Sequence, residues 1–330
     1  METVTLGQTS LQISRIGFGA IPIQRLGDDD AIAVIRRCLE LGITFLDTAN
    51  QYTTSEGRIG RALDGWNGPV VLATKTQSRT AEGVAEHLAQ SLRMMRVDSI
   101  DLYQLHNVST FADYEKVMQP GGAYETVMKA VQDGRVKHVG ITSHQIDVAK
   151  ESVKSGRFET VMYPLNFIVH EPGEELLALS DQHGVGFIAM KPFAGGMIDN
   201  ASLAMKYPVP ECNPHTRCRA HSGDRGDHPH RGVAARAHRR GERRDRAAEK
   251  GDGQPFLQAL RLLSAMYRGD PDLSRAGIPN NGPTNATGER GHRLDRECFG
   301  EGRDMHLLRR VRGALPVPAS HQGDAVGERR

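Results

Sequence analysis

The chain has 330 residues, of which 38% are hydrophobic, and a formal net charge of +2. This length allows one large α/β barrel or two smaller domains. The near-neutral charge gives no argument for a nucleic-acid partner, and no apolar run reaches the roughly 18 residues that a membrane helix needs. The N-terminus lacks the basic and apolar regions of a signal peptide, and the four cysteines are scattered. We therefore expect a cytoplasmic protein with no membrane partner.

The first part of the chain predicts a regular order of elements. Val4–Ser14 predicts a short hairpin that turns at Gly7 and Gln8. Short β-rich runs then alternate with helical stretches whose apolar residues recur every three or four positions. The predicted strands are Arg15–Gly19, Thr44–Asp47, Val70–Thr74, Ile100–His106, His138–Thr142, Thr160–Pro164 and Gly186–Lys191. The predicted helices are Asp29–Leu41, Thr80–Met95, Ala123–Asp133, Gln145–Ser155 and Glu174–His183.

Local signals agree with these helices. Asp28–Asp30 suit a helix N-terminus, and Gly134 and Gly184 stand where a glycine would end a helix. Cys38 falls inside a helical pattern and is expected to pack as a small apolar side chain. The segment from residue 1 to 207 therefore has the pattern of a folded domain.

The alternation of strand and helix predicts a parallel sheet with right-handed crossovers. An open, flavodoxin-like sheet is the alternative. Seven such units, with no GxGxxG after the first strand, favour a barrel over a doubly wound sheet. We predict an α/β fold in which residues 1–207 form a (β/α)8 TIM barrel that has reached its seventh strand.

The composition changes near Tyr207. Residues 1–207 carry 11 Arg and 8 Lys, whereas residues 208–330 carry 22 Arg, one Lys and 8 of the 14 His. Apolar periodicity almost disappears from the second part, so we expect residues 208–330 to form a disordered tail. Only Gln254–Met266 has the apolar residues for a helix, which we expect to be isolated.

Polar residues stand at the ends of three predicted strands, where a barrel carries its active site. Asp47, Lys75 and His106 close successive strands, and Tyr52 follows in the loop after Asp47. Each of them alone is a weak signal, because a single polar residue at a strand end is usually structural. Together they suit proton transfer. An ammonium lowers the pKa of a nearby phenol, a carboxylate holds that ammonium in place, and a histidine could orient a carbonyl or assist the proton relay.

The stretches that hold these residues resemble the aldo-keto reductase family. The matching stretches are Gly42–Tyr52, Ala73–Lys75 and Asp101–His106. The resemblance implies that the four residues match the family's catalytic tetrad, with Tyr52 as the general acid. It also implies an NADP(H)-dependent oxidoreductase that reduces a small-molecule aldehyde or ketone to an alcohol.

The family binds NADP(H) across the barrel mouth without a Rossmann fold, so the resemblance also implies cofactor contacts. Ser143 and His144 match the loop after the fifth strand and would hold the nicotinamide carboxamide. Many relatives have Asn where His144 stands, but an imidazole can make the same hydrogen bond. Asn166 would add a polar contact, near Met162, where many relatives place Gln.

The loop after the seventh predicted strand also matches the family. It begins at Lys191 and contains Gly195 and Gly196. These two glycines would let the backbone approach the pyrophosphate of the cofactor. A plain turn is the alternative interpretation of the two glycines.

Nothing after Tyr207 predicts an eighth strand or a site for the 2′-phosphate. Reading the degenerate codons of residues 210–220 from their second base permits Gln-Asn-Val-Ile-Pro-Ile-Pro-Gly-Val-Glu, which resembles the family's eighth strand and phosphate loop. The same reading of residues 304–319 permits Cys-x-x-Cys-x-x-Cys-x-x-x-Cys-Pro, the ferredoxin run of an iron–sulfur cluster. We therefore predict a one-base frameshift after Tyr207 in a ferredoxin-tailed bacterial type of reductase. The chain as written would then carry no iron–sulfur cluster and bind the cofactor weakly or be inactive.

Two other interpretations of the tail remain. The Arg-rich run of residues 236–246 would attract phosphate, so the chain could be a non-catalytic barrel with a nucleic-acid-binding tail. Interleaved acids and scarce aromatic residues disfavour this function. A zinc site has suitable ligand types but no common spacing; its candidates are Cys212, Cys218, His228 and His230. We expect no metal and no nucleic acid, and the oligomeric state stays open.

Overall fold

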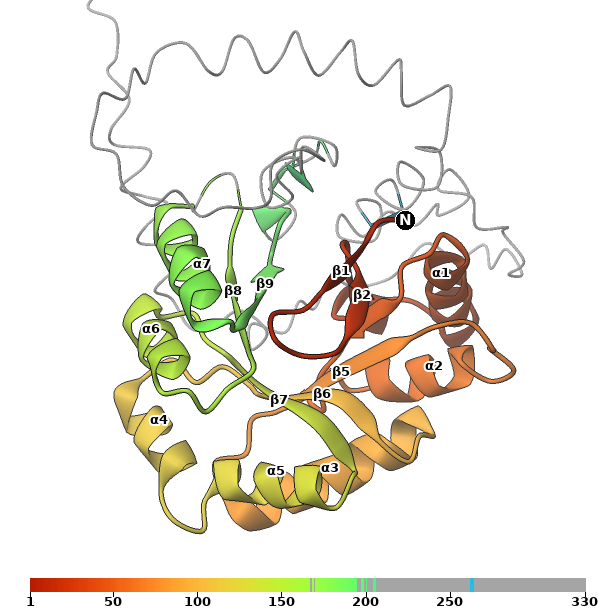
Figure 1. The fold of residues 1–330 in the computed structure, drawn as a ribbon. Coiled ribbons are helices and arrows are strands. Elements are labelled where there is room, and N and C mark those ends of the chain that lie inside the picture. Colours follow the sequence, from red (N-terminus) through yellow and green to blue (C-terminus); the bar gives the residue numbers. More distant parts are fainter. Residues whose placement is uncertain are drawn as a thin grey trace, which may run out of the picture. The chain divides into compact units, whose positions relative to one another are not determined.

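Figure 1 shows the fold of the chain in a computed structural model. It describes residues 1–166, 168, 170–194, 197, 198, 200, 204, 205, 262 and 263. The chain divides into two units, Met1–Asn280 and Asn281–Arg330, and every described residue belongs to the first. The predicted join after residue 207 and nearly all of the predicted tail lie outside the described residues.

Seven parallel strands form one sheet in the order β3-β4-β5-β6-β7-β8-β9. The strands are β3 (Phe18–Gly19), β4 (Phe45–Asp47), β5 (Val71–Thr76), β6 (Ile100–Leu105), β7 (Val136–Thr142), β8 (Thr160–Pro164) and β9 (Gly186–Met190). A doubly wound sheet reverses its strand order at a switch point, whereas a barrel adds each new strand beside the previous one. The unbroken order therefore confirms the incomplete (β/α)8 barrel and rules out the flavodoxin-like alternative.

The helices lie on the outer side of this curved sheet (Figure 1). They are α1 (Asp28–Glu40), α2 (Ser55–Ala62), α3 (Ala81–Met95), α4 (Phe111–Met118), α5 (Ala123–Gln132), α6 (Ile146–Lys154) and α7 (Glu171–His183), and a short 3-10 helix, η1 (Pro22–Arg25), follows β3. The sequence did not predict η1, α2 or α4. The α2 segment contains two glycines, which are weak helix formers, and α4 has only eight residues, too few for a clear period.

The predicted helix signals are confirmed. Asp28, Asp29 and Asp30 occupy the first turn of α1, where negative charge favours the helix N-terminus. Gly184 ends α7 at φ 69°, and Gly134 follows α5 at φ 75°. Cys38 is fully buried, and burial raises the pKa of its thiol.

An antiparallel hairpin, β1 (Thr3–Thr5) and β2 (Gln12–Ser14), fills the amino-terminal end of the barrel. Its apolar side chains form a cluster with inward-facing residues of β4, β5 and β6; the members are Leu6, Leu11, Ile13, Phe45, Ala73 and Leu102. The backbone N–H of Gln8 donates to the carbonyl of Gly184 at 2.9 Å. The hairpin therefore closes one end of the barrel and leaves the carboxyl ends of the strands for a site.

Two residues of the predicted tail belong to the core. Leu262 and Leu263 are helical and buried in one cluster with Ala204, Met205 and side chains of α1. Burying a leucine contributes about 1.5–3 kcal/mol, which favours packing over isolation. The expectation of an isolated helix at 254–266 is therefore wrong for these two leucines.

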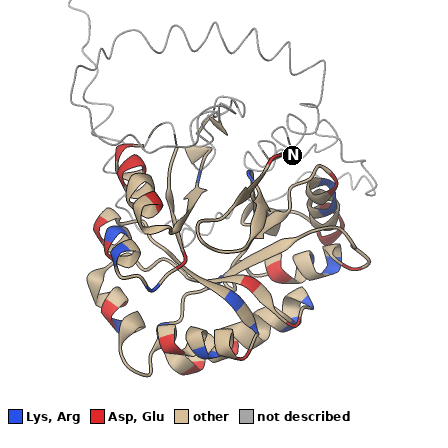
Figure 2. Cartoon of the chain, in the orientation of Figure 1, with Lys and Arg blue, Asp and Glu red and all other residues tan. Residues whose placement is uncertain are grey.

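Charged side chains gather on the outer helices, and the strands carry few of them (Figure 2). This distribution makes a charged group among the strands unusual, because it must be removed from water. Among the residues that the structure describes, no helix is both long and apolar enough to cross a membrane.

The hairpin turn gives a test of how the barrel end is closed. Gly7 lies at φ 57°, and a Cβ there would stand 2.3 Å from the backbone nitrogen of Gly186. Gly134 has a similar positive φ, but a Cβ there would meet nothing within 4 Å. We expect Gly134→Ala to cost about 1–2 kcal/mol of backbone strain, and Gly7→Ala to cost about 1–3 kcal/mol more because the backbone must shift. Urea unfolding measures both, and equal losses would contradict the close packing of this turn.

Candidate active site

Neighbouring barrel strands bring the four predicted residues to one edge of the sheet. Asp47 is the last residue of β4, and Tyr52 lies in the loop that follows. Lys75 is the last residue but one of β5, which continues to Thr76, and His106 directly follows β6. Because parallel strands end on the same side of a sheet, residues far apart in sequence converge here.

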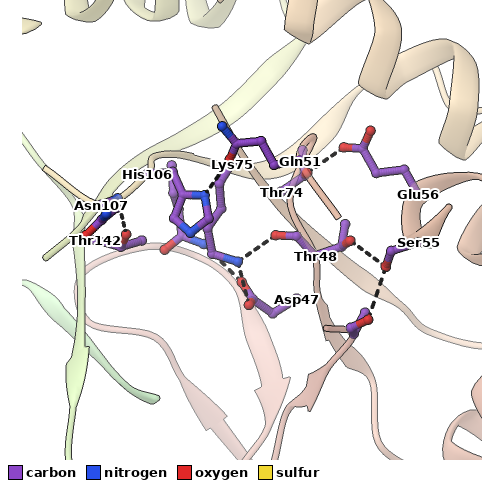
Figure 3. Close-up of polar contacts among 12 residues, drawn as sticks. Asp47, Thr48, Gln51, Ser55, Glu56, Thr74, Lys75, His106, Asn107 and Thr142 are labelled. Atoms are coloured by element: carbon purple, nitrogen blue, oxygen red, sulfur yellow. Dashed lines mark hydrogen bonds and ion pairs between the residues drawn. The ribbon is translucent and has the colours of Figure 1, made fainter. Parts of the chain in front are cut away.

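Lys75 is the most unusual of the four, because its side chain is only 1% exposed. Lysine is almost never fully buried unless it is paired. Its Nζ donates to Asp47 Oδ2 at 2.6 Å and to the carbonyl oxygen of Thr48 at 2.5 Å (Figure 3). The same Nζ lies 5.4 Å from the ring centroid of Tyr52. The site therefore holds one ammonium, satisfied by a carboxylate and a carbonyl, beside a phenol.

Asp47 uses both carboxylate oxygens. Oδ2 accepts from Lys75, and Oδ1 accepts from Nε2 of Gln104 at 3.1 Å. Burial raises the pKa of Asp47, while the charge of Lys75 and the two hydrogen bonds lower it. Sequence reasoning missed Gln104, although a polar side chain between Tyr103 and Leu105 near the end of a predicted strand was a possible signal.

His106 lies against Tyr52, with ring centroids 5.8 Å apart and an angle of 79° between the rings. Burial lowers the pKa of His106 to about 3, and the charges of Lys75, His144 and Arg79 add to this shift. The imidazole is therefore neutral near pH 7. Its Nδ1 lies 3.1 Å from Oε1 of Gln51, a residue that sequence reasoning also missed.

A second polar group supports β5 from the opposite face. Thr74 and Thr76 flank Lys75, so their side chains point away from the barrel interior. Thr74 Oγ1 donates to Glu56 Oε1 at 2.6 Å, and Thr76 Oγ1 lies 2.8 Å from Nδ1 of His87. Burial raises the pKa of Glu56. These bonds fix the strand on both sides of the lysine.

The predicted nicotinamide contacts lie after β7, at the same edge of the barrel. Ser143 is fully buried, and its hydroxyl bonds the backbone of Gln145. The backbone N–H of His144 donates to Ser109 Oγ at 3.0 Å, and its Nδ1 lies 3.0 Å from Asn107 Oδ1. The structure therefore places Ser143 and His144 beside the loop that follows His106, and their cofactor roles stay predictions.

The remaining cofactor candidates follow β8 and β9. Asn166 Nδ2 donates to the carbonyl oxygen of Lys191 at 3.2 Å, which joins the two loops. Lys191 and Ala194 have φ angles of 57° and 49°, so the backbone turns sharply after β9. Gly195 and Gly196, the predicted pyrophosphate contacts, lie outside the described residues.

Among the residues that the structure describes, no group of three or more His, Cys, Asp or Glu side chains could hold a metal ion. The predicted alternative at Cys212, Cys218, His228 and His230 lies outside them. The described site brings together a phenol, an ammonium, a carboxylate and a neutral imidazole, from Tyr52, Lys75, Asp47 and His106.

Comparison with known proteins gives one family. The aldo/keto reductase family model matches residues 15–263, which extends beyond the predicted join near Tyr207. The uncharacterized oxidoreductase YqkF of Bacillus subtilis is 30% identical over 225 residues, covering 62% of this chain and 71% of that protein. L-galactose dehydrogenase of Arabidopsis thaliana is 28% identical over 217 residues, covering 60% of this chain and 67% of that protein. The holo form of aldo-keto reductase AKR11C1 from Bacillus halodurans has a TM-score of 0.54 and 30% identity, over 60% of this chain and 68% of that one.

The buried ion pair predicts a distinct pattern of stability. Asp47→Asn leaves the ammonium of Lys75 buried without a counter-charge, so we expect a loss of about 3 kcal/mol in the free energy of unfolding. Adding Lys75→Met to that variant should restore part of the loss, because no buried charge remains. Asp133→Asn, which breaks the exposed pair with Arg135, should cost less than about 1 kcal/mol. Chemical denaturation tests this set, and a double variant no more stable than Asp47→Asn would contradict it.

The lowered pKa of His106 predicts a loss of stability in acid. The folded state keeps the ring neutral down to about pH 3, whereas the unfolded chain binds a proton near its ordinary pKa of about 6.5. The stabilising contribution is therefore full above pH 6.5 and falls as the pH is lowered. Between pH 7 and pH 5 the wild type should lose about 2 kcal/mol more than His106→Asn. Equal losses in denaturant titrations at the two pH values would show that the ring is not held neutral.

Proposed function

This chain belongs to the aldo/keto reductase family of oxidoreductases, and we propose that it reduces an aldehyde or ketone to an alcohol with NADPH. The observation that carries the proposal is the buried Lys75 ammonium, held by Asp47 and placed 5.4 Å from the ring of Tyr52. A binding surface has no need for a buried cation beside a phenol, because burying the charge costs stability. A tyrosine that gives up its proton becomes an anion, and a nearby cation stabilises that anion directly.

In the proposed reaction Tyr52 gives its hydroxyl proton to the carbonyl oxygen of the substrate. Bound NADPH would supply the hydride that the carbonyl carbon accepts, so carbon and oxygen each gain one hydrogen and an alcohol results. The phenolate left on Tyr52 is stabilised by the ammonium of Lys75. Asp47 keeps that ammonium charged and in place, and a proton from solvent restores the phenol.

The polar residues at the ends of β7, β8 and β9 fit a cofactor bound across the barrel mouth. Ser143 and His144 would hold the carboxamide, and Asn166 and Lys191 belong to loops that are already joined by a hydrogen bond. The left-handed backbone at Lys191 gives the turned chain that close contact with a phosphate group requires. The preference for NADP(H) over NAD(H) rests on the family resemblance and is part of the proposal.

The frameshift after Tyr207 is a further part of the proposal. It accounts for the change of composition, and the intact relative would carry a ferredoxin-like segment that this chain lacks. Leu262 and Leu263 are buried in a core cluster of the barrel, and the family match extends to residue 263. These two residues of the predicted tail are therefore related to the barrel. Sequencing the gene across the codon of Tyr207 tests it: an extra base would show that the printed sequence is in error and that the real protein is a full barrel reductase, whereas a base that is truly absent would mean that the gene is inactivated.

Removing the phenol should abolish carbonyl reduction. We expect Tyr52→Phe to lower kcat/KM for an aromatic aldehyde by about 100- to 10,000-fold, the usual contribution of a positioned proton donor. Tyr124→Phe is the matched control, because the Tyr124 hydroxyl donates to the carbonyl oxygen of Arg157 on the outer layer. Its rate should equal that of the wild type in an assay that follows NADPH consumption.

Two outcomes would contradict the proposal. Full activity of Tyr52→Phe would show that another group supplies the proton. A folded protein with the reading frame restored after Tyr207 that neither binds NADPH nor reduces any aldehyde would show that the barrel is not catalytic; the chain as written would then be the non-catalytic barrel with the Arg-rich run of residues 236–246 as its binding segment.

A further inference from the structure

We propose that Gln104 is a positioning residue for carbonyl reduction: its side-chain amide holds one oxygen of Asp47, so that the other oxygen keeps the ammonium of Lys75 beside Tyr52. The inference rests on the proposed function, since it concerns how the site of that reaction keeps its geometry. The effect of Gln104 on the proton donor would pass through two side chains, Asp47 and Lys75.

The strand register places Gln104 next to the buried lysine. Gln104 on β6 is in register with Lys75 on β5. Residues in register on neighbouring strands point to the same face of a sheet, so both side chains enter the barrel interior. Leu102, two residues earlier on β6, belongs to the apolar cluster of the hairpin. Gln104 therefore lies at the boundary between that cluster and the ion pair, where a leucine would have extended the apolar side.

The orientation of the Gln104 amide follows from the chemistry of its partner. Nε2 lies 3.1 Å from Oδ1 of Asp47, and Oδ2 of the same carboxyl group lies 2.6 Å from Nζ of Lys75 (Figure 3). A proton on this carboxyl group would leave the buried ammonium without a counter-charge, so the group is an anion and only accepts hydrogen bonds. An amide oxygen turned toward Oδ1 would meet a second acceptor. The nitrogen of the amide must therefore face Asp47.

This hydrogen bond has a cost that the stability of the barrel does not explain. Gln104 is fully buried, and its Oε1 has no hydrogen-bond partner among the described residues. A buried acceptor without a partner destabilises a fold. On β7, a Cβ at Gly140 would stand 2.2 Å from Oγ1 of Thr160 and 3.1 Å from Cγ of Gln104, so the two polar side chains also require a glycine inside a strand. The contact with Asp47 is the favourable feature that accounts for an amide at this position.

The amide leaves the carboxylate of Asp47 one arrangement. With Oδ1 held by Gln104, Oδ2 accepts from Lys75, whose Nζ also donates to the carbonyl oxygen of Thr48. Two fixed acceptors keep the ammonium 5.4 Å from the ring centroid of Tyr52. Without the amide, the carboxylate could rotate about its Cβ–Cγ bond and the ammonium could follow it. Burial raises the pKa of Asp47, and the hydrogen bond from Gln104 joins the charge and the hydrogen bond of Lys75 in lowering it.

The direct test is a carbon NMR titration of the full chain, labelled with 13C at the aspartate carboxyl groups. Loss of a signal in Asp47→Asn identifies Asp47. Gln104→Met keeps the length of the side chain and removes the donor. Because the hydrogen bond favours the charged form, the Asp47 midpoint should rise by about one pH unit or more. The other titratable groups gathered at this edge, Lys75, Tyr52 and His106, are the same in both proteins. No upward shift would overturn the proposal.

Thr160→Val is the matched control. Thr160 on β8 is also fully buried, its Oγ1 also has no partner among the described residues, and it lies on the other side of Gly140. Its Asp47 midpoint should equal that of the wild type. In urea, Thr160→Val should be at least as stable as the wild type, because a methyl group replaces an unpaired hydroxyl. Gln104→Met should stay close to the wild type, because removal of the unpaired oxygen offsets the lost hydrogen bond.

A measurement on the wild type decides the question if Gln104→Met does not fold. The side-chain amide protons of Gln104, assigned through its backbone signals, should shift with the same midpoint as the Asp47 carboxyl group. Amide protons that do not respond to this titration would overturn the proposal.

Kinetics separates this inference from the proposed function, in the protein with its reading frame restored after Tyr207. Gln104→Met should lower kcat about ten- to a hundredfold, the effect of one hydrogen bond to a charged group. The KM values for the aldehyde and for NADPH should stay within about twofold, whereas a residue that only supports the barrel would change kcat, KM and stability together.

The two proposals fail in different ways. A folded protein that shows the expected Asp47 midpoints but reduces no carbonyl compound would refute the proposed function and leave the hold of Gln104 on Asp47 intact. An active reductase with equal Asp47 midpoints in the wild type and Gln104→Met would do the reverse.

Discussion

The ion pair between Lys75 and Asp47 is the constraint on which the rest of the site depends. An ammonium that is 1% exposed is stable only if its charge and its donors are satisfied, and the pair at 2.6 Å with the Thr48 carbonyl does this. Replacing such a pair by apolar side chains would often be neutral or stabilising. Its presence among strands that carry few charges is therefore better explained by the chemistry of Tyr52 than by the stability of the barrel.

The fold supplies the geometry that this pair requires. Consecutive strands β4, β5 and β6 carry Asp47, Lys75 and His106 to one edge, while the hairpin fills the opposite end with apolar side chains. The threonines beside Lys75 hold β5 from its outer face through Glu56 and His87. The buried Lys75–Asp47 pair thus lies at the carboxyl ends of the strands, opposite the apolar cluster of the hairpin.

The barrel could be predicted because short β-rich runs alternate with helices whose apolar residues recur every three or four positions. The helix α2 could not, since Gly57 and Gly60 weaken its local signal and it forms by packing against α3. The four site residues stood at strand ends within recognisable stretches. Gln51 and Gln104 lie in the same stretches, but their contacts could not be predicted, because the partner of an amide becomes apparent only when segments distant in sequence lie side by side. For the same reason the sequence could predict a helix around Leu262 and Leu263 but not their burial in the core, because their contacts are with residues distant in sequence.

The central claim is that this site transfers a hydride to a carbonyl carbon while Tyr52 supplies the proton. The most direct measurement uses NADPH labelled with deuterium at C4, an aromatic aldehyde and the full chain, with the product examined by mass spectrometry. The account predicts an alcohol with deuterium on the carbinol carbon, and no carbon-bound deuterium when unlabelled NADPH is used in D₂O. A product without label at that carbon, or a folded chain with the reading frame restored after Tyr207 that gives no product, would contradict it.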